Sequence, residues 1–210
     1  MMKMRNATRA LAILHIAFVV LQLASAHNTN LQTGDVVLLP GNCYLCKLIQ
    51  DQEGCHYSHV GIIIVDENEQ LQVAEAADTV QLTPFEQFVA RADPSYPVSI
   101  RRYREMNETI SLAIPLAFRI FYDGLSYDPK FLWNNFNTKG EMLYCSEFVA
   151  KFWNRLIPGL FQTKPMRYDV HPAEWKAYFA PDEPPSGLPG VSPCDVWRHP
   201  AFQDIELKYV

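Results

Sequence analysis

The chain has 210 residues, of which 49% are hydrophobic and 20% charged, so its composition is that of a globular protein rather than a disordered one. Its formal net charge is −5 at pH 7, and its densest basic cluster is the short run Arg101, Arg102 and Arg104. Nucleic acids require clustered lysine and arginine on their partners, so the charge argues against a nucleic-acid-binding function.

The first 26 residues have the three parts of a secretory signal peptide. A basic start with three Lys or Arg residues is followed by an apolar run, Leu11 to Leu23, and by the small-residue cleavage site Ala24-Ser25-Ala26. The run is shorter than the roughly 20 residues of a membrane-spanning helix, so we predict cleavage near Ala26-His27 rather than a membrane anchor. The mature chain, with a formal charge of −8, would be secreted or periplasmic, where it can meet the cell envelope or a membrane surface.

Several segments of the mature chain are predicted to be strands of an antiparallel sheet, because they are short, rich in β-branched residues and either wholly apolar or alternating. They are residues 35–39, 60–65, 71–76 and 98–103, with a further strand in residues 202–210.

Helical segments are predicted between and after these strands. Thr83 and Glu86, on either side of Pro84, read as the capping box of a short helix. Residues 109–122 are mostly helical, with Pro115 as a site where the segment kinks or splits, and residues 145–156 repeat apolar side chains at helical spacing. From about residue 158 the chain is rich in proline. We therefore predict one α+β domain, residues 27–210, with a Pro-rich C-terminal extension.

The chain has five cysteines: Cys43, Cys46, Cys55, Cys145 and Cys194. An oxidising compartment favours disulfides, and if Cys145 stays free the other four can form two bridges in three possible pairings. The segment 41–56, expected to be a short helix and a loop, also offers Cys and His at spacings that resemble a zinc site. Irregular spacing in an exported chain favours disulfides, so we predict no metal and no cofactor.

Three separated residues have the chemistry of a cysteine hydrolase. His59 begins an apolar strand, and Glu75 continues the apolar face of the next strand, where a carboxylate needs a partner. With Asp66 to Asn68 as the hairpin loop, His59 would lie directly opposite Glu75, whereas a loop one residue longer would put them on opposite faces. Cys145 stands at the start of a helix, where backbone N–H groups favour a thiolate. The three match a nucleophile, a base and an orienting acid.

Four fragments in their order resemble the YiiX/YaeF-type permuted papain-like amidases of the NlpC/P60 superfamily. They are G-D-V-V-L-L, S-H-V-G-I-I-I, V-A-E-A-A-D-T-V-Q-L-T-P-F-E-Q-F and Y-C-S-E-F-V, within residues 33–155. The resemblance implies a circularly permuted papain-like fold, an antiparallel sheet packed against helices, with the nucleophile at a helix N-terminus. In the permuted members the His strand precedes the Cys helix, as it does here.

By position, the resemblance implies Cys145 as nucleophile, His59 as general base and Glu75 as the orienting residue. Asp35, in the Gly-Asp strand start, is expected to shape the cleft. Tyr57 is expected either to line the cleft and assist the oxyanion hole or to pack in the core, and Ser146 is a further cleft candidate. The Cys-rich segment before His59 is expected to form one wall of the cleft.

The leading hypothesis is an exported cysteine hydrolase that cleaves an amide or related acyl bond through an acyl-enzyme. Acyl-amide, peptide and lipid-like substrates are all compatible with the superfamily, since function depends on the site rather than on the fold. One alternative is acyl transfer between lipids, or thiol lipase activity, at the same three residues. Another is a non-catalytic binding module that keeps the fold, which a disulfide at Cys145 would favour.

Overall fold

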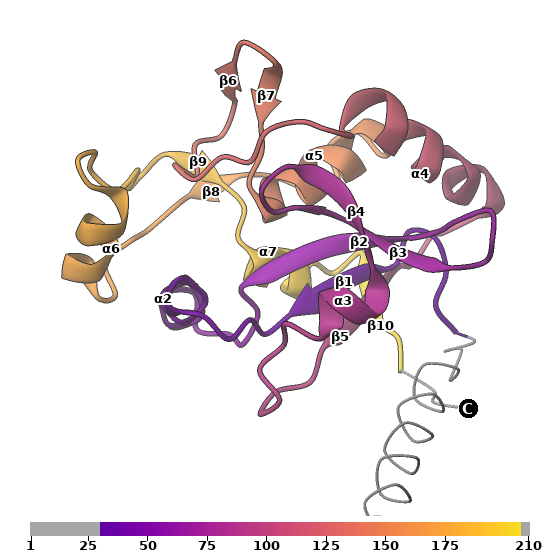
Figure 1. The fold of residues 1–210 in the computed structure, drawn as a ribbon, viewed down its shortest axis with the longest axis horizontal. Helices are drawn as coiled ribbons and strands as arrows, with labels where there is room; N and C mark the ends of the chain where they lie inside the picture. Colours follow the sequence, from indigo (N-terminus) through magenta and orange to yellow (C-terminus); the bar gives the residue numbers. More distant parts are fainter. Residues whose placement is uncertain (1–29, 207–210) are drawn as a thin grey trace, which may run out of the picture. The chain divides into compact units, whose positions relative to one another are not determined.

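The computed structural model describes residues 30–206, and the predicted signal peptide lies outside them. Residues 32–205 form one compact unit around a six-stranded antiparallel sheet with the strand order β10-β5-β1-β2-β3-β4 (Figure 1). The strands are β1 (Val36–Leu39), β2 (His59–Val65), β3 (Leu71–Ala76), β4 (Val80–Pro84), β5 (Ser99–Tyr103) and β10 (Phe202–Asp204). The α+β class and the antiparallel sheet beside helices are confirmed.

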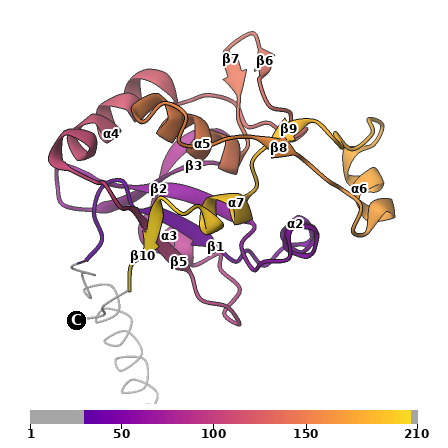
Figure 2. The same ribbon diagram turned by 180° about the vertical axis from the view of Figure 1, so that it is seen from behind.

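The helices are α2 (Tyr44–Glu53), α3 (Phe85–Val89), α4 (Glu108–Phe121), α5 (Cys145–Leu156), α6 (Pro172–Phe179) and α7 (Pro193–Arg198). Helices α4 and α5 lie on one side of the sheet and α3 on the other (Figures 1 and 2). Helix α5 packs against β2 and β3, and Phe148, Phe152 and Trp153 of its apolar face are fully buried. The predicted bounds of α5 and β3 match the structure. Among the described residues, none of the helices is both long and apolar enough to cross a bilayer.

The hairpin between β2 and β3 has a longer loop than predicted. Asp66 Oδ1 accepts hydrogen bonds from the backbone N–H groups of Asn68 and Gln70, both at 2.9 Å, and Glu69 adopts a left-handed φ of 62°. This side-chain cap closes a five-residue loop, so Val65 pairs with Leu71 and Gly61 pairs with Glu75. The predicted opposition of His59 and Glu75 is therefore wrong by two residues. A shift of two keeps both side chains on the same face of the sheet.

The capping box predicted after this hairpin is also wrong. Thr83 belongs to the edge strand β4 and pairs with Val73, and α3 begins without a side-chain cap, so there is no capping box. The helix predicted over residues 109–122 is confirmed as α4, which continues through Pro115 as a single 14-residue helix and does not split there.

The C-terminal extension folds back on the domain in short elements. Strands β8 (Lys164–Pro165) and β9 (Pro189–Gly190) pair, and a second small hairpin joins β6 (Asn135–Asn137) to β7 (Gly140–Met142). Helix α7 packs against α5, and the disulfide Cys55–Cys194 joins it to the end of α2. Of the three possible pairings, the structure contains this bridge together with Cys43–Cys46. The cysteines of the segment 41–56 are therefore in two different disulfides and do not form the alternative zinc site. Cys145 is the free thiol.

Candidate active site

Cys145 is the first residue of α5 and lies at the wall of a pocket, 7% exposed. The preceding Tyr144 has an extended backbone and provides no side-chain cap. The N–H groups of the first turn of a helix have no partners within the helix, so the start of α5 presents donors and a positive dipole end beside the sulfur.

His59 and Glu75 meet across the hairpin as diagonal neighbours. The Nε2 atom of His59 lies 2.5 Å from Oε2 of Glu75, and the imidazole ring stacks on Phe88 of α3 at 5.5 Å between centroids. Cys145 lines the same pocket as His59, and its sulfur interacts electrostatically with the imidazole. Because Nε2 is used by Glu75, Nδ1 is the ring nitrogen left for the sulfur. The structure thus brings together the three residues that sequence reasoning selected.

Sequence reasoning missed two further partners of Glu75. The guanidinium Nη2 of Arg91 donates to both carboxylate oxygens at 2.8 Å, and the hydroxyl of Thr83 also hydrogen-bonds the carboxylate. Arg91 follows α3, and its guanidinium carbon lies 4.8 Å from the Phe88 ring centroid. Glu75 itself indicated that such partners exist, because a fully buried carboxylate needs more than one hydrogen-bond donor.

The electrostatics favour an ionic form of the site. Burial alone lowers the pKa of His59, but the charge and hydrogen bond of the Cys145 sulfur, followed by those of Glu75, raise it to about 9. Burial alone raises the pKa of Glu75, but His59, Thr83 and Arg91 lower it to about 2. Glu75 is therefore a carboxylate at neutral pH, and its negative charge favours the imidazolium form of His59.

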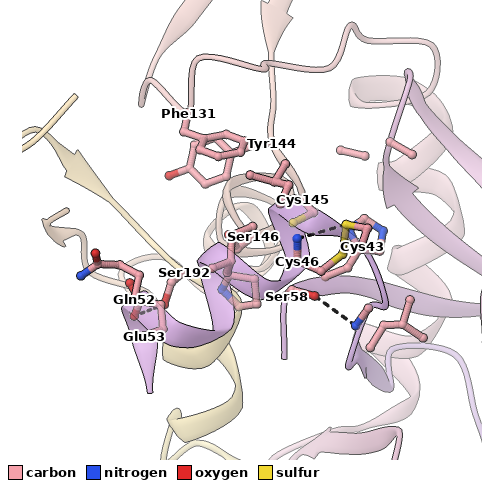
Figure 3. Close-up of a pocket in the computed structure, with 18 of the residues that line it drawn as sticks. Cys43, Cys46, Gln52, Glu53, Ser58, Phe131, Tyr144, Cys145, Ser146 and Ser192 are labelled. Carbon is pink, nitrogen blue, oxygen red and sulfur yellow. Dashed lines mark hydrogen bonds between the residues drawn. A yellow bond between two sulfur atoms is a disulfide. The ribbon is translucent and has the colours of Figure 1, made fainter. Parts of the chain in front are cut away.

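The pocket has a volume of about 840 Å³, and four parts of the chain line it. Figure 3 shows Cys145 and Ser146 of α5 together with the disulfide of the Cys-rich segment. The sheet end contributes Leu39 and His59, the turn after α3 contributes Arg91, and α2 and its approach contribute Cys43, Leu45, Cys46 and Ile49. The apolar remainder includes Phe131, Tyr144, Met166, Tyr168, Trp175 and Val191. The Cys-rich segment forms one wall, as predicted, and the C-terminal extension forms another.

Ser146 lines the pocket, but its hydroxyl is used in a hydrogen bond within the protein. Its Oγ donates to the carbonyl oxygen of Val191 at 2.7 Å, and the residue is 1% exposed. Ser146 therefore attaches the C-terminal extension to the start of α5.

Asp35 and Tyr57 lie outside the lining of this pocket. The Asp35 carboxylate is fully buried in an ion pair with Arg102, with Nε–Oδ1 at 2.7 Å and Nη2–Oδ2 at 2.8 Å. It precedes β1, at the opposite end of that strand from Leu39, which pairs with His59. Tyr57 is buried and packs on Trp197, with ring centroids 5.3 Å apart. The expected cleft role of Asp35 is thus not supported, and of the alternatives for Tyr57 the packed aromatic is the observed one.

A further buried acid lies near Cys145. Glu147 accepts hydrogen bonds from the backbone N–H of Asn134 at 3.1 Å and pairs with Lys151 at 2.8 Å, and its Oε2 has no hydrogen-bond partner within the described residues. Burial raises the pKa of Glu147 to about 7, against the opposing effect of Lys151. Glu147 fixes the loop before β6 to the first turn of α5.

Comparisons with known proteins agree with this fold. A family model described as "Permuted papain-like amidase enzyme, YaeF/YiiX, C92 family" matches residues 30–206. The chain is 26% identical over 134 residues to the uncharacterized protein YiiX of Escherichia coli K12, and this match spans 60% of the chain and 59% of that protein. A solved structure, titled metalloprotein yiiX from Escherichia coli O157:H7, superposes with a TM-score of 0.72 at 23% identity, covering 85% of the chain and 98% of that structure.

Proposed function

The chain belongs to the permuted papain-like amidase family, and from this premise we propose that it is a cysteine hydrolase in which Cys145, His59 and Glu75 cleave an amide or related acyl bond. One observation carries the proposal. The one cysteine outside a disulfide stands at a helix N-terminus and lines the same pocket as His59, whose Nε2 is held by a buried carboxylate.

In the proposed reaction, the Cys145 thiolate attacks the substrate carbonyl carbon, and the backbone N–H groups at the start of α5 stabilise the oxyanion that forms. The His59 imidazolium donates its proton to the leaving amine, which gives a thioester at Cys145 and a neutral imidazole. His59 then removes a proton from water, which attacks the thioester and releases the acid. Glu75 holds the imidazole by Nε2, and Arg91 with Thr83 holds Glu75.

The pocket supports a substrate that combines an apolar part with a polar group. Its lining is mainly aromatic and aliphatic, while the guanidinium of Arg91, 43% exposed, lies at the sheet end. Acyl-amides, peptides and lipid-like esters all meet this description. Acyl transfer to a second lipid is the alternative reaction, since the volume of about 840 Å³ has room for an acceptor beside an acyl-enzyme.

A metal has no part in this proposal. The similar solved structure is titled a metalloprotein. In this chain, no group of three His, Cys, Asp or Glu side chains within residues 30–206 is placed to hold an ion. We derive no step through a metal.

Export remains part of the proposal, supported by the signal-peptide pattern of residues 1–26 and by two disulfides. The mature enzyme would then act outside the cytoplasm, at the envelope or in the surrounding medium.

The test combines turnover with trapping of the acyl-enzyme. Purified protein is incubated with N-acyl amino acids, muropeptides and phospholipids, and products and protein mass are measured by mass spectrometry. Turnover of one class that is lost in Cys145→Ala, together with an acyl adduct at Cys145, supports the proposal. Adduct transfer to an added lipid alcohol in preference to water would favour the acyltransferase. A Cys145 that iodoacetamide modifies only after unfolding contradicts catalysis by this thiol.

A further inference from the structure

The pocket wall contains a second sulfur site that the proposed hydrolysis does not use. Cys43 and Cys46 form a disulfide in a Cys-x-x-Cys motif at the N-terminus of α2, and both residues line the pocket that contains Cys145 (Figure 3). We propose that this disulfide is a thiol–disulfide exchange site for a dithiol partner, and that its reduction loosens the pocket wall beside Cys145.

Access distinguishes this bridge from the other one. Cys43 is exposed and Cys46 half-buried, whereas in the second bridge Cys55 is half-buried and Cys194 fully buried, so only the first bridge has an exposed cysteine. Exchange requires a thiolate to reach one sulfur of the disulfide, so a partner approaches the Cys43–Cys46 bridge without unfolding the domain.

The position of Cys43 at the start of α2 determines which sulfur of the disulfide leaves as a thiolate. Cys43 is the N-cap of α2, and its Sγ accepts a hydrogen bond from the backbone N–H of Cys46 at 3.0 Å. A thiolate at the N-cap is stabilised by the free N–H groups and the helix dipole, and a more stable thiolate leaves faster. The incoming dithiol therefore attacks Sγ of Cys46, and Cys43 leaves as the thiolate.

The second thiol of the partner then attacks the mixed disulfide and releases Cys46 as a thiolate. The partner is oxidised from dithiol to disulfide, the Cys43–Cys46 bond is reduced by the same two electrons, and the two protons of the dithiol are available to the released thiolates.

Loop size makes this bridge the easier one to reduce. The Cys43–Cys46 bridge spans a sequence separation of 3, whereas Cys55–Cys194 spans 139. A bridge that closes a longer loop restricts the unfolded chain more and stabilises the fold more. Reduction of Cys43–Cys46 thus sacrifices little of the global stability.

The contacts of α2 show what reduction would release. Its C-terminal end stays fixed to the C-terminal extension by Cys55–Cys194 and by Gln52, whose amide contacts Asp169 at 3.0 Å and the N–H of Val170 at 2.9 Å. The disulfide joins Cys43 to Cys46 within the first turn, and the Gln50 amide, near the other end of α2, donates to the carbonyl of Gly41 ahead of the helix at 3.1 Å. Loss of the disulfide removes the covalent bond that fixes the conformation of this first turn, where it borders the pocket.

The first experiment measures selective reduction. The folded protein is equilibrated with increasing dithiothreitol, blocked with N-ethylmaleimide and analysed by peptide mass spectrometry. We expect Cys43 and Cys46 to become modified at a dithiothreitol concentration at least about tenfold below that needed for Cys55 and Cys194. Reduction of both bridges together, or of Cys55–Cys194 first, overturns the proposal.

The second experiment measures the pocket wall. The rate at which a bulky fluorescein maleimide modifies Cys145 is divided by the rate for iodoacetamide, so that changes in thiol reactivity cancel. In Cys43→Ser/Cys46→Ser this ratio should rise at least about threefold, because local opening admits the larger reagent. Lys47→Ser alters the same helix at an exposed side chain, keeps the disulfide and the Asp51–His171 contact, and should leave the ratio unchanged. An unchanged ratio in the cysteine variant contradicts the loosening. Neither readout uses turnover, so both stand apart from the proposed hydrolysis.

Discussion

Glu75 holds the imidazole of His59 at 2.5 Å although its partner across the hairpin is Gly61. In an antiparallel pair, the diagonal neighbour two positions away lies on the same face and within reach of a long side chain. The short glycine between them leaves the Glu75 side chain room to reach His59, and Thr83 and Arg91 complete its set of donors.

The first prediction concerns this orienting contact. Glu75→Gln keeps the shape of the side chain but removes the charge that favours the imidazolium, so kcat should fall by about 10²–10⁴ while the fold is retained. The exposed Glu86→Gln, close by in α3, should leave kcat unchanged. A Glu75→Gln variant with wild-type kcat would remove Glu75 from the proposed site.

The second prediction concerns pH. Cys145 and Glu75 raise the pKa of His59 to about 9, so the imidazolium persists at neutral pH and is lost as the pH rises through 9. The alkaline limb of kcat/KM should therefore lie near pH 9. In Glu75→Gln it should move to lower pH, because one of the two negative neighbours is gone. If the alkaline limb does not move in this variant, the pKa of His59 does not depend on Glu75.

The third prediction concerns Glu147. Its folded pKa of about 7 lies above the ordinary 4.5, so the stability linked to its protonated form is fully present below pH 4.5 and is lost as the pH rises through 7. Glutamine does not titrate. Between pH 5 and pH 8 the free energy of unfolding of Glu147→Gln, relative to the wild type, should increase by up to about 3 kcal/mol. Urea unfolding at several pH values measures it, and a pH-independent difference would contradict the shift.

The fourth prediction concerns Gly61. A Cβ atom there would lie 2.4 Å from Cγ1 of Val73 and 2.8 Å from the carbonyl oxygen of Ala74, inside the central sheet. Gly61→Ala should destabilise the protein by about 1–3 kcal/mol, because the backbone contact cannot move aside. The double variant Gly61→Ala/Val73→Ala should cost less than the sum of the two single changes, since one of the clashes is removed. Strict additivity in urea unfolding would argue against this contact.

Local pattern determined much of the fold. The bounds of β3 and α5 follow from alternation and helical spacing, and the position of Cys145 at the first residue of α5 follows with them. The odd number of cysteines predicted one free thiol, and the structure leaves Cys145 free. These features depend on a few consecutive residues or on simple counting, so the sequence states them directly.

The tertiary structure decided how these pieces meet. The side chain of Asp66 set the loop length and moved the register by two residues, and only the even size of that shift kept His59 and Glu75 on one face. Arg91 and Thr83 interact with Glu75 from separate elements. Cys55 forms a disulfide with Cys194, 139 positions away, and Asp35 forms an ion pair with Arg102 outside the pocket. The sequence by itself thus selected the reactive residues, while pairing over long separations, which no local pattern encodes, placed them in contact.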